Sequence, residues 1–297
     1  PQHLMRGRIR RLNVIAGTLH LLSSLYMAPW LRLPIRGMSY EEWKVHATYV
    51  TVGWNSTDPD KDDCGKDECT IQQCTRYVAG GVPLESLVFG FHFGSAIAHY
   101  WYAWHSIRYY QLLLTHGNPL RWIEYAVTAA LMIVVILVTM GIVAVWELVC
   151  AAILTAATQF FGWLCEVVVQ DRKNSGASSM YAYRWWFFWI GAVVALPPWL
   201  SIFVTYDNSR RNSNVPVPWF VTAIVIGLFV MFSSFAVVMA WRLKDPRSKS
   251  SALLNVQAEK YYIVLSFVSK ALLAWLLWFG AFRRNSINLK QAPPPPC

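Results

Sequence analysis

The sequence predicts an all-α membrane protein built as one bundle of seven transmembrane helices. Of its 297 residues, 56% are hydrophobic and only 14% are charged, whereas soluble domains usually contain about 25% charged residues. The apolar residues are grouped in long blocks and do not alternate with polar ones. A block of about 20 apolar residues is the length that crosses a bilayer as a helix. We therefore expect a multi-pass integral membrane protein surrounded by the lipid bilayer.

Seven such blocks follow one another along the chain. Many begin or end at Trp or Tyr, as expected for aromatic residues at the two membrane interfaces. The predicted spans cover residues 12–30, 84–104, 122–143, 148–169, 185–206, 219–241 and 261–282. No segment between them is long enough to fold separately, so we predict a single domain over residues 1–285. The proline-rich residues 286–297 are expected to be disordered.

The distribution of Lys and Arg favours a cytoplasmic N-terminus and an extracellular C-terminus. In that orientation 14 basic residues lie on the cytoplasmic side and 11 on the other. Six of these 11 fall in one long loop, where charge has less influence on orientation. The net charge of +10 does not indicate nucleic-acid binding, because the basic residues lie in short runs between the apolar blocks.

The long loop, residues 31–83, joins the first two predicted spans. It contains a glycosylation sequon at Asn55 and three cysteines, Cys64, Cys69 and Cys74. Glycosylation and disulfides both occur outside the cytosol, which agrees with the predicted orientation. Which cysteines pair is left open. Residues 47–53 are expected to form one strand of a short extracellular β-hairpin.

Lys270 lies in the middle of the last predicted span, where it is the only charged residue. A charged side chain at the centre of a bilayer costs roughly 2.5–3.5 kcal/mol. Lysine can reach the interface from near a helix end, but Lys270 is about ten residues from either end of its span. Ionisable groups at such depth are usually functional. We therefore expect Lys270 to belong to a site, with ion pairing for packing alone as the alternative.

Two residues are predicted to compensate the charge of Lys270. Ser266 lies one turn earlier on the same helical face, and Glu124 is the nearest carboxylate by pattern. The two helices start on the same side of the membrane and the lysine leans toward its helix start, so the geometry permits a pair. The alternative is that Glu124 pairs with Arg121 at the interface. A buried amine is also the group that condenses with a carbonyl to form a Schiff base.

The residues around these positions resemble the heliorhodopsin family. RWIEYAVTAALMIVVILVTMGI (121–142) and YYIVLSFVSKALLAW (261–275) are similar to the family's third and seventh helices. The motifs IAGTLHLL, SAIAH, FGWLCE and VPWFV occur in the family's order, so the resemblance covers nearly the whole chain. It implies a rhodopsin-like fold, a cytoplasmic N-terminus, a homodimer through the fourth and fifth helices, and a photoreceptor that is not an enzyme.

The resemblance also implies a cofactor, all-trans retinal, bound covalently to Lys270 as a protonated Schiff base. Glu124 would then be its counterion and Ser266 its hydrogen-bond partner. Ordinary microbial rhodopsins usually have Asp at the position of Ser266, which leaves Glu124 as the sole close counterion here. Further residues match positions that line retinal in the family, although ordinary packing is the alternative for each aromatic one. They are Tyr125, Thr128, Thr158, Gly162, Pro198, Trp199, Leu228 and Phe232.

Two details of this pocket are specific expectations. Gly162 is expected to leave room for a ring beside Trp199, because it has no side chain. His20 and His99 match a polar cluster of the family that takes up the released proton. The alternative for both histidines is that they are hydrogen-bonded core residues.

Two functions stay open. The first is a light sensor without transport, in which a proton moves from the Schiff base to the internal polar cluster during a slow photocycle. The second is a light-gated passive proton channel, for which Glu85, His92, Glu147 and Glu166 would be further stations. His92 and Glu147 are otherwise expected to be interfacial residues. No metal-ligand spacing or nucleic-acid motif occurs, and the sequence does not reveal a signalling partner.

Overall fold

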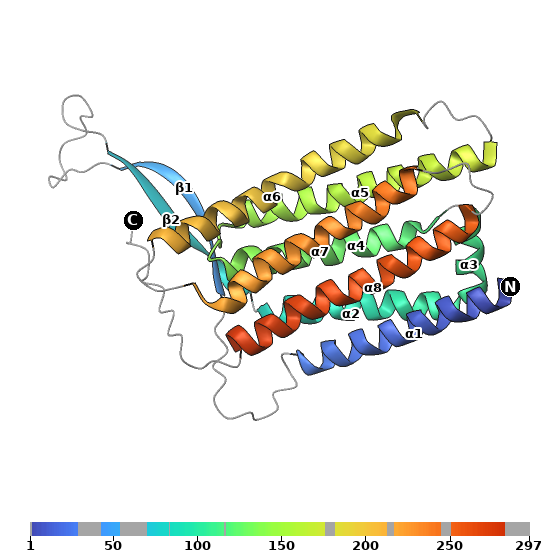
Figure 1. The fold of residues 1–297 in the computed structure, drawn as a ribbon. Helices are drawn as coiled ribbons and strands as arrows, with labels where there is room; N and C mark the ends of the chain where they lie inside the picture. The colour runs from blue at the N-terminus through green and yellow to red at the C-terminus, as the bar shows by residue number, and fades with distance from the viewer. Residues whose placement is uncertain are drawn as a thin grey trace.

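In the computed structural model, the described residues are 2–28, 43–53, 70–82, 84–115, 117–175, 182–212, 217–244 and 251–282. They form a bundle of long helices lying side by side, with a two-stranded ribbon at one end (Figure 1). The helices are α1 (Gln2–Tyr26), α2 (Leu84–Trp104), α3 (Ser106–Thr115), α4 (Pro119–Thr139), α5 (Val145–Ser175), α6 (Arg184–Asn212), α7 (Trp219–Lys244), α8 (Ser251–Leu277) and the π-helix η2 (Trp278–Phe282).

Five of the described helices, α4 to α8, are long and apolar enough to cross a membrane. Helix α2 coincides with the second predicted span, and α1 overlaps the first but begins ten residues before it; both are interrupted by polar residues, and neither has a stretch as apolar as those of α4 to α8. These polar groups face the bundle interior: Asn13 and His20 of α1, and His92 and His99 of α2, are all buried. Hydropathy averaged along a helix underrates both elements, because these four polar side chains lie in the protein interior.

Helix α3 is an element that the sequence did not predict. It is only ten residues long and contains Arg108 and Gln111, so it lacks the apolar length of a span. Its buried residues are Tyr109, Tyr110 and Leu113. The helix lies at the end of the bundle nearest the N-terminus (Figure 1). We call this the α3 end. Here tertiary contacts stabilise a short helix whose sequence reads as a polar connection.

The start of α4 is set by its local sequence. Asn118 caps the helix by accepting a hydrogen bond from the Arg121 backbone N–H at 3.3 Å, and Pro119 occupies the first turn. Proline suits this position because the first-turn N–H groups have no partner within the helix. Gly117, just before the cap, has φ +81°, a conformation that favours glycine. This turn places Arg121 and Glu124 at the start of α4, near the α3 end.

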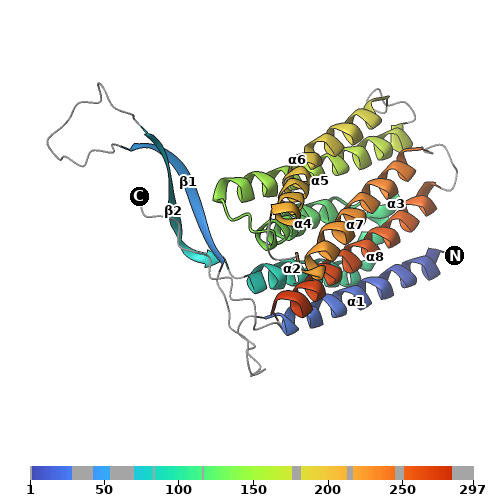
Figure 2. The ribbon, with the colours of Figure 1, turned by 60° about the vertical axis from the view of Figure 1, so that its left-hand side comes forward.

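The opposite end of the bundle is the ribbon end, where strands β1 (Trp43–Gly53) and β2 (Thr70–Val82) lie (Figure 2). They pair antiparallel, with Tyr49 opposite Cys74. The strand predicted at residues 47–53 lies within β1. Asn55, Cys64, Cys69 and the proline-rich residues 286–297 lie outside the described residues.

Buried apolar side chains fill the ribbon-end half of the bundle. One cluster contains Met132, Ile136, Leu273 and Leu277 together with residues of α2, α5, α6 and α7. Most buried polar and charged side chains instead lie from Lys270 toward the α3 end.

Candidate functional site

The Lys270 amine is buried and held by the two predicted partners. Its Nζ donates hydrogen bonds to Glu124 Oε1 at 2.9 Å and to Ser266 Oγ at 2.7 Å. Lys270 is 2% exposed, so this ion pair is shielded from solvent. The predicted contact of Lys270 with Glu124 is therefore present, and Arg121, the alternative partner of Glu124, pairs with other carboxylates.

The Glu124 carboxylate has two further donors that balance its burial. Ser95 Oγ donates to Oε1 at 2.5 Å, and Thr128 Oγ1 donates to the same oxygen at 3.3 Å. Ser95 was not predicted from the sequence. One signal could have found it: His92, Ser95 and His99 are spaced i, i+3, i+7, which puts them on one face of α2.

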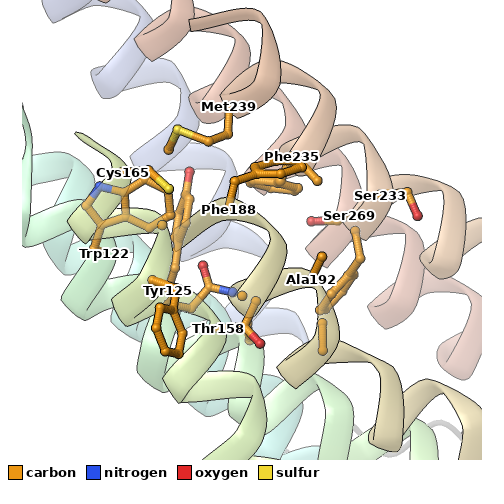
Figure 3. Close-up of a pocket in the computed structure, with 18 of the residues that line it drawn as sticks. Trp122, Tyr125, Thr158, Cys165, Phe188, Ala192, Ser233, Phe235, Met239 and Ser269 are labelled. Atoms are coloured by element: carbon orange, nitrogen blue, oxygen red, sulfur yellow. The ribbon is translucent and has the colours of Figure 1, made fainter. Parts of the chain in front are cut away.

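A cavity of about 340 Å³ begins at Lys270 and runs between α4, α5, α6, α7 and α8. Its volume lies in the range typical of small-molecule sites, about 300–1,000 Å³. Most of the wall is aromatic or aliphatic. Figure 3 shows Trp122, Cys165 and Met239 on one side of the cavity and Ala192, Ser233 and Ser269 on the other.

An apolar cavity with one primary amine at its edge suits a particular ligand class. The walls favour a long apolar body, and a lysine amine can form a covalent bond to a carbonyl carbon. A protonated Schiff base nitrogen at the Nζ position would have one N–H, which could donate to Glu124 or to Ser266, whereas the free amine donates to both. The site thus fits an apolar aldehyde.

The sequence places these features in a known family. A sequence profile of the heliorhodopsins matches residues 9–282. The chain belongs to the heliorhodopsin family. Family membership implies a retinal-binding, light-sensing integral membrane protein, and retinal is an apolar aldehyde of the kind that the cavity fits. No curated protein sequence matches the chain closely.

Most of the pocket residues expected from the resemblance line the cavity of this heliorhodopsin. Pro198 and Leu228 are not among its lining residues, although both are buried. Leu228 packs in the apolar cluster at the ribbon end instead. The expected residues that do line the cavity with Lys270 are Tyr125, Thr128, Thr158, Gly162, Trp199, Phe232 and Ser266.

The ring of Trp122 lies against Gly162. Gly162 and Trp199 both line the cavity, and room for a ring beside Trp199 stays a prediction. A Cβ atom on Gly162 would lie 2.3 Å from Cζ3 of Trp122. Trp122 also lines the cavity and was not predicted to do so. Its place on α4, three residues before Tyr125, is the signal that could have identified it, because residues at i and i+3 share a helical face.

We expect Gly162→Ala to destabilise the protein by about 1–3 kcal/mol, the usual cost of overpacking a filled site. The added methyl group must displace the Trp122 ring, which also lines the cavity, so the retinal spectrum should shift as well. Thermal unfolding in detergent and the absorption spectrum measure the two effects. Gly94→Ala is the matched control, because its nearest contact would be 3.7 Å from Thr128. Equal behaviour of the two variants would contradict the prediction.

Three histidines form one buried group beside this site. His20 Nδ1 lies 2.8 Å from His92 Nδ1, so one of these nitrogens donates and the other accepts. The His20 ring stacks on His99, with centroids 5.5 Å apart. His99 Nδ1 lies 2.8 Å from Asn13 Oδ1, an acceptor, so His99 carries its proton on Nδ1. The Nε2 atoms of all three have no hydrogen-bond partner among the described residues.

This grouping corrects the expectation for His92. The sequence analysis favoured an interfacial position, but His92 is 0% exposed and contacts His20. It belongs with His20 and His99 because all three face the interior between α1 and α2, helices that pack closely along their length. Hydropathy alone does not show whether a histidine side chain on a helix faces the bundle interior or the membrane interface.

The predicted acidic stations are not gathered in one place. Glu85 and Glu147 lie in the first turns of α2 and α5, toward the ribbon end (Figure 1). Glu147 is exposed and accepts a hydrogen bond from Ser201. Glu166 is buried near the α3 end.

Glu166 belongs to a buried ion-pair group that we call the Arg121 cluster: Arg121, Glu166, Arg242 and Glu259. Glu166 pairs with Arg121 at 2.7 Å and with Arg242 at 2.8 Å. Arg121 also pairs with Glu259. All four side chains are 2–3% exposed. With two cations and two anions, the cluster is electrically balanced, as burial of charge requires.

Glu259 was missed by the sequence analysis, which started the last span two residues later. Glu259 Oε1 accepts hydrogen bonds from the Tyr109 hydroxyl at 2.6 Å and from Asn118 Nδ2 at 2.9 Å. Burial raises the pKa of the Tyr109 hydroxyl, so it stays protonated as a donor. The spacing from Glu259 to Ser266 and Lys270, seven and then four residues, puts all three on one face of α8 and could have revealed it.

Proposed function

We propose that the protein is a retinal-binding light sensor in which retinal is attached covalently to Lys270. The observation that carries this proposal is the buried Lys270–Glu124–Ser266 contact at the edge of an apolar cavity. Bound there, retinal would supply visible-light absorption, and the nitrogen that can hold a proton would be Nζ of Lys270. The protein residues then determine how that charge is held and where the proton goes.

Glu124 is proposed as the counterion. It is the carboxylate within hydrogen-bond distance of Nζ, and Ser95 and Thr128 keep its oxygen oriented. A carboxylate at this distance stabilises a positive charge at the Nζ position. Ser266 accepts a second hydrogen bond from the same nitrogen and adds no charge.

The histidine group is proposed as the place that receives the proton. His20, His92 and His99 are buried. The nitrogens that can take up a proton are Nε2 of His99 and Nε2 of whichever of His20 and His92 donates from Nδ1. His99 lies one turn from Ser95 on α2, so the group adjoins the Glu124 carboxylate. A proton on any of these rings stays inside the protein, which suits a long-lived signalling state.

The membrane topology follows from the same interior. We propose seven spans: the five apolar helices α4 to α8 together with α1 and α2, whose polar residues are shielded inside the bundle. The α3 end is proposed to face the cytoplasm and the ribbon end the outside, as the basic residues predict. Homodimerisation and glycosylation at Asn55 remain proposals from sequence.

The interior favours a sensor over a proton channel. Toward the ribbon end, the buried residues that follow Thr128 on α4 and Lys270 on α8 are apolar; they include Ile133, Ile136, Leu273 and Leu277. A proton path needs polar groups or water across the whole bilayer. In the part of the chain that the structure describes, such groups lie mainly between Lys270 and the α3 end.

Photocurrents test this choice. Cells that express the protein with retinal should show no light-evoked current, even under a large proton gradient. A current that reverses at the proton equilibrium potential would establish the channel function instead. A channel would also make Glu85 and Glu147 relevant, since they lie toward the ribbon end, so Glu85→Gln and Glu147→Gln should then change the current.

We expect Glu124→Gln to weaken the protonated form of the retinal Schiff base. Glutamine keeps the size of the side chain but removes the negative charge that the Lys270 nitrogen contacts at 2.9 Å. The visible band should shift and lose intensity at neutral pH. Absorption spectra over a pH series measure this, with Glu147→Gln as control because Glu147 is exposed. Identical spectra for Glu124→Gln and the unsubstituted protein would mean that Glu124 is not the counterion.

A further inference from the structure

Trp122 contacts two different parts of the molecule. One part is the retinal cavity, of which Trp122 forms a wall beside Tyr125 (Figure 3). The other is the Arg121 cluster, because the indole N–H of Trp122 donates to Glu166 Oε2. Trp122 is 7% exposed, so both contacts are made inside the bundle.

Glu166 is itself held firmly in place. Arg121 and Arg242 each donate to one of its oxygens, at 2.7 and 2.8 Å. The turn before α4 packs against it as well: a Cβ on Gly117 would lie 2.6 Å from the Glu166 carboxyl carbon. An acceptor fixed in this way gives the Trp122 indole one preferred position.

The ring of Trp122 is also confined on its other sides. Gly162 provides the space that it fills, and the rings of Tyr125 and Tyr262 pack edge to face with it, at centroid distances of 6.3 and 5.9 Å. Tyr125 in turn lies under the Lys270 amine, 5.2 Å from ring centroid to Nζ. A contact path therefore runs from Lys270 through Tyr125 and Trp122 to Glu166.

The Arg121 cluster joins four helices at the α3 end: α4 through Arg121, α5 through Glu166, α7 through Arg242 and α8 through Glu259. Arg242 extends it to Asn255 of α8 at 3.1 Å. A change in the hydrogen bond of Trp122 to Glu166 is thus a change in the group that holds these helix ends together.

We propose that Glu166 is a positioning residue for the cavity wall, acting through the indole N–H of Trp122, and that Trp122 transmits light-driven changes in the cavity to the Arg121 cluster. This inference rests on the proposed retinal function. It gives Glu166 a role different from that of a proton station, since its two arginine partners and the indole N–H hold it as a carboxylate. It also locates the light-dependent output at the α3 end.

Infrared difference spectroscopy, light minus dark, tests the link in the full-length protein with retinal. Tryptophan labelled with ¹⁵N in the indole identifies the N–H stretch, and the carboxylate stretch reports on Glu166. We expect the unsubstituted protein to show a light-induced shift in both bands. Trp122→Phe should abolish the indole band and reduce the carboxylate signal, while Glu166→Gln should move the indole band to the frequency of a weaker hydrogen bond.

The matched controls are Trp163→Phe and Asp207→Asn. Trp163 lies on α5 near Gly162 but is 37% exposed and is not a cavity residue. The Asp207 carboxylate forms an exposed pair with Arg211. Both substitutions should leave the two bands unchanged.

Absorption maxima give a second readout. If Glu166 acts through Trp122, the shifts caused by Trp122→Phe and Glu166→Gln should not add in the double variant. Additive shifts, or a light-induced indole band that survives Trp122→Phe, would overturn the inference. If Glu166→Gln does not fold, Trp122→Phe alone still tests the inference, because phenylalanine keeps an aromatic ring in the cavity wall. Failure of the retinal proposal is recognised separately, since the unsubstituted protein would then show no visible band.

Discussion

Lys270→Ala is expected to abolish the visible absorption band completely. The substitution removes the Nζ atom, which is the proposed attachment point of retinal and contacts Glu124 and Ser266. Without an amine at the edge of the cavity, retinal can at most bind reversibly and absorb as a free aldehyde. Spectra recorded after adding all-trans retinal to the purified protein measure the effect.

Two controls separate lost attachment from lost folding. Lys260→Ala changes a lysine on the same helix that is not part of the cavity, and it should keep the full band. The variant Lys270→Ala/Glu124→Gln removes the carboxylate that the single substitution leaves unpaired, so it should fold at least as well, as circular dichroism will show. A visible band that persists in folded Lys270→Ala would contradict covalent attachment at this residue.

Arg121→Met is expected to have the largest effect on stability, a loss of about 3–5 kcal/mol in the free energy of unfolding. Arg121 pairs with both Glu166 and Glu259, and all three are at most 3% exposed. Methionine occupies a similar volume but leaves two buried carboxylates with Arg242 as the remaining cation of the cluster. Thermal and denaturant unfolding in detergent, followed by circular dichroism, measure the loss.

The surface pair of Arg211 with Asp207 is the matched control. Its two atoms are as close, 2.8 Å, but the side chains are 74% and 52% exposed. Arg211→Met should cost no more than about 1 kcal/mol, because solvent screens the pair. The double variant Arg121→Met/Glu259→Gln restores the charge balance and should be more stable than Arg121→Met alone. If Arg121→Met were as stable as Arg211→Met, the cluster would not hold the helix ends together.

The helices were largely predictable from sequence, with two exceptions. Apolar blocks of about 20 residues predicted spans that each fall on a helix of the structure. Helix α3 was missed because its residues become helical by packing Tyr109 and Leu113 against the bundle. The part of α8 that holds the buried Glu259 was missed, because a charged residue beside an apolar block was taken as the end of a span.

The candidate site was predictable to the extent that its residues share one helix. Ser266 and Lys270 are one turn apart, so their contact follows from helical geometry. Trp122 and Gly162 lie on different helices, and nothing in their spacing shows that one fills the space of the other. The same holds for His92, whose contact with His20 depends on how α1 packs against α2.

The sequence by itself determined that the protein lies in a membrane, that it belongs among the heliorhodopsins, and that Lys270 is the residue on which the candidate site is proposed. These conclusions depend on local properties of the sequence: the length of the apolar blocks, a charged residue in the middle of a predicted span, and short motifs along the chain. Only the tertiary structure decided which buried charges pair. Arg121 lies three residues from Glu124, yet it pairs with Glu166 and Glu259, which are 45 and 138 positions away along the chain. The physical reason is that a buried charge is stabilised by whichever opposite charge the helix packing brings within a few ångströms.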